Sequence, residues 1–234
     1  RWTMDDQHVL TWPAEPLEVG PLAERLHVIP GSGDYQDLVT LAREAQALAA
    51  PKACYRLAYI DDRGDDHVVV DGVTFSSRIL RVNLEDSHRL FAEVATCGVE
   101  VDEWAHGLQD ILWQFWAEAI KESFLRQARN ALRKEQERVY GLRRTSTMAP
   151  GSLADWPIQQ QRPLFQLLGD VEGAIGVRLS SSMLMSPNKS VSGVRFETET
   201  DFVSCSLCPR EVCPGRRQAY DRELIRRGVF VSAQ

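Results

Sequence analysis

The sequence predicts an α+β fold with a partly antiparallel sheet. Helix-spaced and alternating apolar patterns follow one another without the regular strand–helix–strand rhythm of a parallel sheet. One helical pattern is much longer than the rest, from about residue 101 to residue 140. A content of 44% hydrophobic and 26% charged residues is typical of a globular protein. The mixed order and the long helix together place the chain in the α+β class.

The first half of the chain predicts a helix followed by strands. Apolar residues at helical spacing extend from Asp34 to about Leu48, after possible caps at Ser32 and Asp34 and before Pro51. The alternating segment Ala53–Ile60 then predicts a strand, and "DHVVVDGVTF" predicts a second one after an aspartate-rich turn. The aspartates of this turn lack the spacing of a calcium loop, so we expect a solvated hairpin.

A buried strand at 89–98 precedes the long helix. Its apolar residues form a broad stripe, which we expect to pack in the core, although its aromatic members could also face a cofactor. The stripe consists of Leu108, Ile111, Leu112, Phe115, Trp116, Ala119, Ile120 and Phe124, with Trp113 beside it. After Gln127 the helix becomes strongly charged.

The second half predicts a turn-rich loop at 145–157, of a length that is often functional. A short helix at 158–169 and a strand at 174–180 follow. The segment "SSMLMSPNKSVSGVRF" predicts a strand or turn and then another strand, with Gly193 where something approaches the backbone closely. A last helix is expected at 215–228.

Charge and hydropathy exclude some functions. A net charge of −6 argues against broad nucleic-acid binding. No apolar run approaches the roughly 18–20 residues that span a bilayer, and the first ten residues contain no hydrophobic signal segment. We therefore expect a cytoplasmic protein. Residues 209–227 carry six arginines against three acids, which fits either an acidic partner or a solvated helix face.

Three of the five cysteines fall in "SCSLCPREVCPGRR". Cys205, Cys208 and Cys213 have a spacing that lets three thiolates reach one metal ion or cluster. The leading candidate for a fourth ligand is Cys97, at the end of a predicted strand, whereas Cys54 has the apolar neighbours of a core thiol. Spacing alone leaves an iron–sulfur cluster, a structural zinc and free thiols open.

Five segments resemble the activation domain of cobalamin-dependent methionine synthase, in that family's order, from about Asp34 onward. They are "YRLAYIDD", "VVVDGVTFSSRILRVNL", "FAEVATCG", "APGSLADWPIQQQRPLFQLLG" and "SSMLMSPNKSVSGVRF". The most specific element is Met185-x-Pro187-x-x-Ser190-Val191-Ser192-Gly193. The resemblance implies a curved, mainly antiparallel sheet packed with helices. It also implies S-adenosylmethionine binding and the rescue of a corrinoid whose cobalt has been oxidised from Co(I) to Co(II).

The resemblance also implies where a ligand would bind. The candidate residues are Thr147, Ala149, Pro150 and Gly151 in one segment and Ser190, Ser192 and Gly193 in the other. The family's loop resembles R-x-x-P-G-Y, in which the arginine can pair with the methionine carboxylate. Here Thr147 stands at the arginine position and Ser152 at the tyrosine position. Arg143 and Arg144 could replace that arginine only in a loop of different shape.

The function that we expect is reductive activation of a corrinoid methyltransferase system, by docking on a corrinoid-binding protein or corrinoid methyltransferase. An iron–sulfur cluster on the three tail cysteines, with Cys97, would be the electron port. One alternative is a binding module stiffened by zinc, and another is an S-adenosylmethionine-dependent reactivation domain. The expected organisation is an N-terminal segment (1–33), the activation-like domain (34–203) and a cysteine-rich extension (204–234) packed on the same domain.

Overall fold

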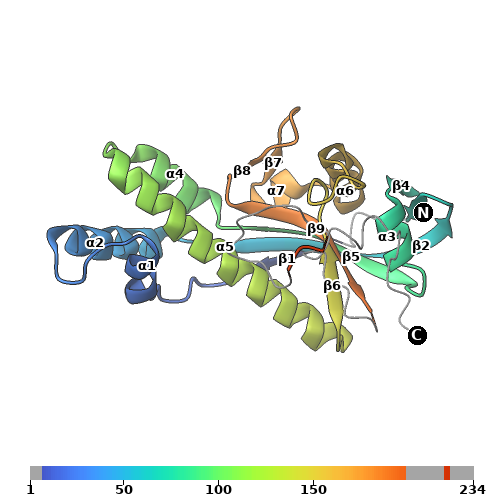
Figure 1. Cartoon of the computed structure of the whole chain (residues 1–234), viewed down its shortest axis with the longest axis horizontal. Helices are drawn as coiled ribbons and strands as arrows, with labels where there is room; N and C mark the ends of the chain where they lie inside the picture. Colours follow the sequence, from blue (N-terminus) through green and yellow to red (C-terminus); the bar gives the residue numbers. More distant parts are fainter. Residues whose placement is uncertain (1–6, 199–218, 222–234) are drawn as a thin grey trace.

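A computed structural model describes residues 7–198 and 219–221. Cys205, Cys208 and Cys213 lie outside these residues, as does nearly all of the helix expected at 215–228. The described part is built on one antiparallel sheet with helices on both faces (Figure 1). The prediction of an α+β fold with a mainly antiparallel sheet and one long helix is confirmed.

Among the described residues, the main sheet has seven strands, in the order β4-β3-β2-β5-β9-β6, with β1 paired to β2. They are β1 (Gln7–Thr11), β2 (Lys52–Arg63), β3 (His67–Val70), β4 (Val73–Ser76), β5 (Arg89–Thr96), β6 (Thr145–Met148) and β9 (Ser190–Glu197). A separate hairpin joins β7 (Arg178–Leu179) and β8 (Met185–Ser186). Since β5 lies between β2 and β9, the strands best predicted from sequence form the centre of the sheet.

The helices divide between two hydrophobic cores, one on each face of the sheet. On one face lie α1 (Val19–Arg25), α2 (Gly33–Leu48), α4 (Val99–Gly107) and the long α5 (Ile111–Tyr140). On the other lie α3 (Arg78–Asn83), α6 (Gln161–Leu168), which follows a 3₁₀ turn at Ile158–Gln160, and α7 (Val171–Ile175). Figure 1 shows α5 running obliquely from α4 at one end toward β6 at the other.

Strand β5 shows how alternation builds both cores at once. Phe91 and Ala95 belong to the core on the α5 face, whereas Leu90, Ala92 and Val94 belong to the opposite core. Successive side chains of a strand point to opposite faces, so a central strand that is apolar throughout is buried on both. A polar side chain on such a strand therefore needs a partner inside the protein.

The predicted helix at 101–140 is wrong in one respect, because it is two helices. Helix α4 ends at Gly107, and α5 begins at Ile111 after the extended residue Asp110. The Asp110 carboxylate accepts hydrogen bonds from the backbone N–H groups of Leu112 and Trp113, at 2.8 and 3.1 Å. A side chain that caps a helix in this way fixes its start, so the apolar pattern crosses a boundary that it does not reveal.

The expected second strand at "DHVVVDGVTF" is also two elements. Strands β3 and β4 form a hairpin around Asp71 and Gly72, whose φ angles are 45° and 75°. Positive φ at both central residues is the geometry of a tight two-residue turn, and Asp-Gly is a sequence that favours it. Apolar residues continue on both sides of this turn, so the sequence resembles a single strand.

Two segments of the second half also differ from prediction. Thr145–Met148, expected to be loop, is strand β6 at the sheet edge, paired with β9. In the strand expected at 174–180, the first two residues complete α7, and only Arg178–Leu179 is strand. Short strands that pair with residues distant in the sequence carry little local signal.

The apolar stripe of α5 is only partly in the core. Trp116, Ile120 and Phe124 are buried as expected. Ile111, Leu112 and Phe115 are not, with exposed fractions of 82%, 45% and 62%. The expectation that these three residues pack in the core is therefore wrong.

Candidate functional site

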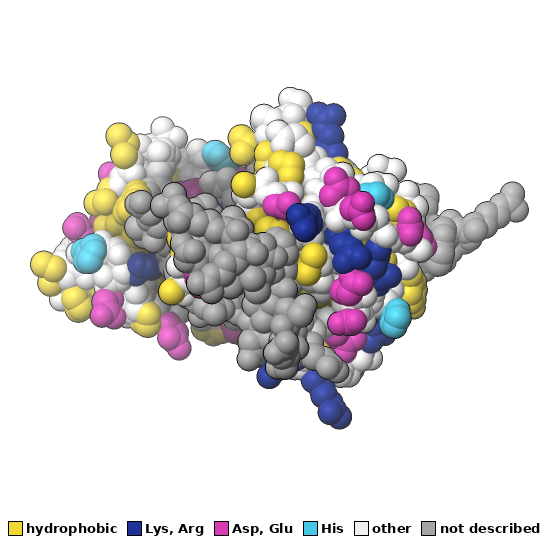
Figure 2. All heavy atoms as spheres, turned by 45° about the vertical axis from the view of Figure 1, so that its right-hand side comes forward, with side chains coloured by type: hydrophobic (Ala, Val, Ile, Leu, Met, Phe, Trp, Pro, Cys, Tyr) yellow, Lys and Arg dark blue, Asp and Glu magenta, His cyan; other side chains and the backbone are white. Residues whose placement is uncertain are grey.

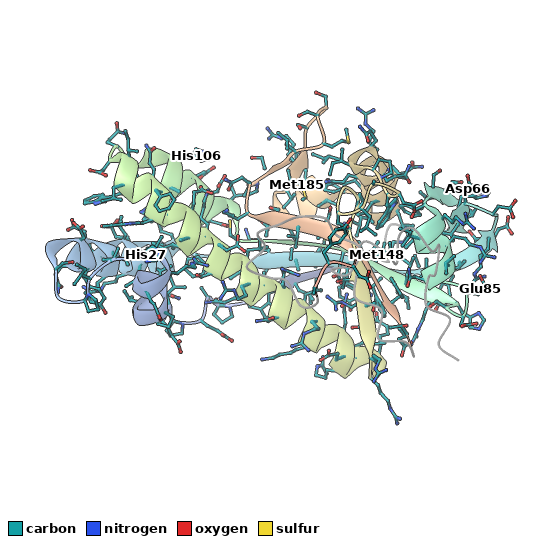
Figure 3. All side chains as sticks on the ribbon, viewed as in Figure 1. His27, Asp66, Glu85, His106, Met148 and Met185 are labelled. Atoms are coloured by element: carbon teal, nitrogen blue, oxygen red, sulfur yellow. The ribbon has the colours of Figure 1, made fainter. Side chains whose placement is uncertain are left out.

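The two segments predicted to bind a ligand meet where β6 and β9 pair. Thr147 lies opposite Arg195, and Gly193 lies opposite Glu93 of β5 on the other side of β9. Figure 3 labels Met148 at this junction. Segments more than forty residues apart are therefore side by side. Successive side chains of β9 point to opposite faces of the sheet. Ser190 and Ser192 therefore point to one face, and Arg195 points to the other.

Position 193 has room only for glycine, because the backbone of Met148 lies against it. A Cβ atom on Gly193 would lie 2.5 Å from the Met148 carbonyl oxygen. Nearly all real Cβ contacts are longer, and a carbonyl cannot turn aside as a long side chain can. The close approach expected at this glycine is therefore made by the end of β6, just before the predicted ligand loop.

The loop after β6 has a defined conformation. Gly151 has a φ of +82°, which an L side chain rarely adopts, and its N–H donates to the Trp156 carbonyl at 2.7 Å. The Ser152 hydroxyl donates to the Ala149 carbonyl at 2.6 Å. Ser152, at the position of the family's tyrosine, thus turns back into its own loop. Pro150 is buried, and Ala149 is partly exposed.

Two side chains anchor the far end of this loop. The Asp155 carboxylate accepts hydrogen bonds from the Ser77 hydroxyl and the Ile79 N–H, at 2.5 and 2.9 Å, at the start of α3. Trp156 is fully buried, and its ring packs edge-on to Phe75 at 6.2 Å. The far end of the loop at 149–156 is therefore held by the core on the face opposite α5, to which Met148, just before the loop, also belongs.

Arg195 is a residue of this region that the sequence analysis missed. Its guanidinium donates to both carboxylate oxygens of Glu93, at 3.0 and 3.1 Å, and lies 3.4 Å from the Thr145 hydroxyl. Gln136 of α5 donates to the same carboxylate at 3.0 Å, and its own Oε1 is buried without a hydrogen-bond partner. The available signal was an arginine inside an otherwise buried strand, a placement that requires a partner.

The Arg195–Glu93 pair is relevant to the ligand loop, which has Thr147 at the position of the family's arginine. Arg143 and Arg144, considered as substitutes from sequence, precede β6 and are exposed. Arg195 instead lies directly across from Thr147, but a bidentate bond to Glu93 already balances its charge. A carboxylate ligand here would have to compete with Glu93.

The other end of β9 connects to the start of α5. Asn188 lies in the segment "MSPNKSVSG", and Lys121 donates to its side-chain oxygen at 2.9 Å. Lys121 also bonds to Asp102 at 2.8 Å and to Glu118 at 2.5 Å. Asn188 in turn donates to Glu118 at 2.8 Å, which closes a ring of three side chains, with Asp102 bonded to Lys121 beside it. The most specific motif of the resemblance is thus tied to α4 and α5.

The ring keeps its charges despite burial. Burial alone would lower the pKa of Lys121, but its bonds to Asp102 and Glu118 outweigh this and raise it. Burial would likewise raise the pKa of Glu118, but Lys121 and Asn188 hold it below its ordinary value. Both side chains are therefore ionised at neutral pH.

The two described cysteines are buried thiols. Cys54 is confirmed as a core residue, and burial raises the pKa of its thiol to about 12. Cys97 is also fully buried on the α5 face, and burial, followed by the nearby Asp102 charge, raises its pKa to about 12. Within the described residues, no group of three or more His, Cys, Asp or Glu could hold a metal ion. A role for Cys97 as fourth ligand stays a prediction, because the other three cysteines lie outside.

The arrangement of sheet and helices is found in a solved structure. The crystal structure described as the MetH reactivation domain bound to AdoHcy superposes with a TM-score of 0.58, over 79% of this chain and 68% of that one. The fold is that of the MetH reactivation domain. Sequence identity with this reactivation domain is 18%. No family model matches the chain, and no curated protein does so.

In residues 7–198 and 219–221, no helix combines the length and the apolar character needed to cross a bilayer.

Proposed function

We propose that this protein reactivates a corrinoid methyltransferase system by docking on a corrinoid-binding protein or domain. The observation that carries the proposal is the fold of the MetH reactivation domain, together with the meeting of the two resembling segments at β6 and β9. The reaction class is a one-electron reduction of Co(II) to Co(I), which can then accept a methyl group. The electron comes from a low-potential donor, and the methyl group from a methyl donor or the system's own substrate.

The surface beside β6 and the loop at 149–156 is the proposed corrinoid-facing region. The anchors at Asp155 and Trp156 support this role, because a preorganised loop loses little conformational freedom on binding. Thr147, Ala149, Pro150 and Gly151 belong to this region, and Gly193 lies beneath its start. Ser190 and Ser192 lie on the face of β9 opposite Arg195, toward the core that also holds Leu153 and Trp156 of the loop, and we assign them a supporting role. The Ser190 hydroxyl bonds to Thr96 and to the Pro187 carbonyl.

S-adenosylmethionine is the less favoured ligand of this region. Thr147 and Ser152 replace the two residues of the family's loop that we expect to matter most. The nearby guanidinium of Arg195 is already paired with Glu93. We therefore propose that the chain recognises the corrinoid partner and that it binds S-adenosylmethionine weakly or not at all.

Co(II) reduction tests the proposal directly. A corrinoid methyltransferase held in the Co(II) state is mixed with titanium(III) citrate, with and without this protein. We expect the Co(II) electron paramagnetic resonance signal to decay faster with the protein, while the absorption of Co(I) appears. Equal decay rates in the two samples would contradict a role in reactivation.

Gly151→Val tests the loop. A side chain at a φ of +82° costs roughly 1–2 kcal/mol, and the new Cβ would lie 2.7 Å from Ile158 Cδ1, so the loop must change shape while the protein stays folded. We expect slower Co(II) decay and weaker binding of the corrinoid protein by calorimetry. Gly20→Ala is the matched control, because nothing lies within 4 Å of its Cβ position and its φ is not positive. Unchanged binding by Gly151→Val would remove the loop from the docking surface.

The cysteine segment carries a second part of the proposal, an iron–sulfur cluster held by Cys205, Cys208 and Cys213. Protein purified without oxygen is expected to contain iron and sulfide and to absorb broadly near ~400 nm, as thiolate-ligated clusters do. Replacing Cys208 by Ser should remove the colour. About one zinc per chain and no colour would instead favour a structural site. Cys97→Ala distinguishes a fourth ligand from a core thiol, since only a ligand affects the metal content.

A further inference from the structure

A pocket of about 370 Å³ opens where α4 meets the start of α5. Its walls are Ala105, His106, Ile111, Gln114, Phe115, Glu118 and Lys121. It is separate from the β6–β9 junction, since α5 extends about 45 Å from this end to the other. Figure 3 labels His106 at this end of the molecule, away from Met148.

The rim of the pocket is apolar and unusually exposed. Ile111, Leu112 and Phe115 form one patch, which we call the α5 patch. Residues three and four apart lie on the same side of a helix, so the three side chains adjoin. Single exposed apolar residues are normal, but adjoining large ones beside a pocket mark interaction surfaces. Figure 2 shows hydrophobic side chains gathered at the end of the molecule where α2 and α4 lie.

The surroundings of the α5 patch are acidic. Residues 99–122 contain six Asp or Glu and one Lys, a net charge of −5. That lysine, Lys121, is buried and already bonded to Asp102 and Glu118. The neighbouring Lys189 is likewise placed between Glu118 and Glu122, at 3.4 and 3.7 Å, and Lys52 is bonded to Glu100 at 2.6 Å, which leaves the six acids with a net excess of three over these lysines. Exposed carboxylates such as Glu103 keep the excess negative charge at the surface.

We propose that the α5 patch and its pocket dock a basic amphipathic segment of a partner protein. An apolar side chain of the segment enters the pocket beside Phe115, and its lysines or arginines face the carboxylates of α4 and α5. Buried aromatic contacts supply most of the affinity in such interfaces, whereas charges steer the approach and fix the orientation. This surface is independent of the corrinoid-facing region and goes beyond the proposed function.

Synthetic peptides test the proposal without any corrinoid. The probe is an amphipathic helical peptide of leucine, alanine and lysine, compared with the same peptide carrying glutamate in place of lysine. We expect only the lysine peptide to bind in calorimetry, and more weakly as salt is raised, because salt screens exposed charges. Equal binding of the two peptides, or no binding of the lysine peptide, would overturn the proposal.

Matched variants locate the binding. Phe115→Ser should weaken the lysine peptide about tenfold, whereas Val139→Ser, an exposed apolar residue near the other end of α5, should have no effect. Glu103→Lys should weaken binding several-fold, and Asp66→Lys, at the opposite end of the molecule (Figure 3), should not. Thermal unfolding shows whether each variant is folded. Full binding by folded Phe115→Ser would overturn the proposal. So would a dimer in sedimentation that Phe115→Ser dissociates, since a second copy would then occupy the patch.

Discussion

Helix α5 is attached to the rest of the protein by a buried ionic network at each end, and the two networks differ. Near its start, Lys121 faces two carboxylates, Asp102 and Glu118, and Asn188 completes a closed ring. Near its end, Gln136 joins a single pair, Arg195 and Glu93, and one Gln136 oxygen has no partner. The first network has an excess of negative charge, and the second is balanced.

The difference extends to the surfaces above the networks. Residues 99–122 carry a net charge of −5, whereas residues 123–140 carry five Lys or Arg against two Glu, a net of +3. The Asp110 cap and Arg138 in the last turn also complement the dipole of α5. The end of the molecule formed by α4 and the start of α5 is therefore acidic and carries exposed apolar residues, whereas the last turns of α5 are basic.

The largest decrease in the free energy of unfolding should come from Lys121→Met. It leaves the Asp102 carboxylate buried without its cation, and breaking a buried pair in this way typically costs about 3–5 kcal/mol. Urea unfolding should show a loss of that size in the free energy of unfolding. The double variant Lys121→Met with Asp102→Leu should recover much of it, since no charge is then left unpaired. No recovery would mean that Lys121 acts through packing.

A smaller decrease in the free energy of unfolding is expected from Arg195→Met. Glu93 is slightly exposed and keeps the hydrogen bond from Gln136, so the cost should be about 2–3 kcal/mol. The same urea titration measures it, and Glu93→Gln in the same background should restore stability. A loss larger than that of Lys121→Met would reverse the ranking of the two networks. S-adenosylmethionine binding that rises in Glu93→Gln would show that Glu93 keeps Arg195 from that ligand.

The sequence predicted the elements whose signals are local. Helix α2 was predicted from its apolar spacing, and its Ser32 cap is present, with the hydroxyl accepting the Tyr35 N–H at 3.1 Å. Strands β2, β5 and β9 are long and apolar enough to be read directly. The break between α4 and α5 was missed because Asp110 caps a helix inside a continuous apolar pattern.

The site was harder to predict, because it depends on pairing between distant segments. Nothing near Thr147 in the sequence indicates that Arg195 lies across from it, or that β6 is a strand at all. Gly193 was expected to permit a close approach, but only the sheet register identifies the Met148 carbonyl as the approaching group. The exposure of Ile111 and Phe115 was missed for a related reason, since an apolar stripe does not show which of its residues the rest of the protein covers.

The length of α5 also sets a distance between partners. At a rise of about 1.5 Å per residue, Phe115 and Gln136 are separated by roughly 30 Å along the helix axis. A small protein domain has about this diameter, so a molecule seated at the α5 patch leaves the β6–β9 surface free. The helix is then a spacer. Under the two proposals above, both partners have room on the protein at the same time, and the arrival of one does not require the departure of the other.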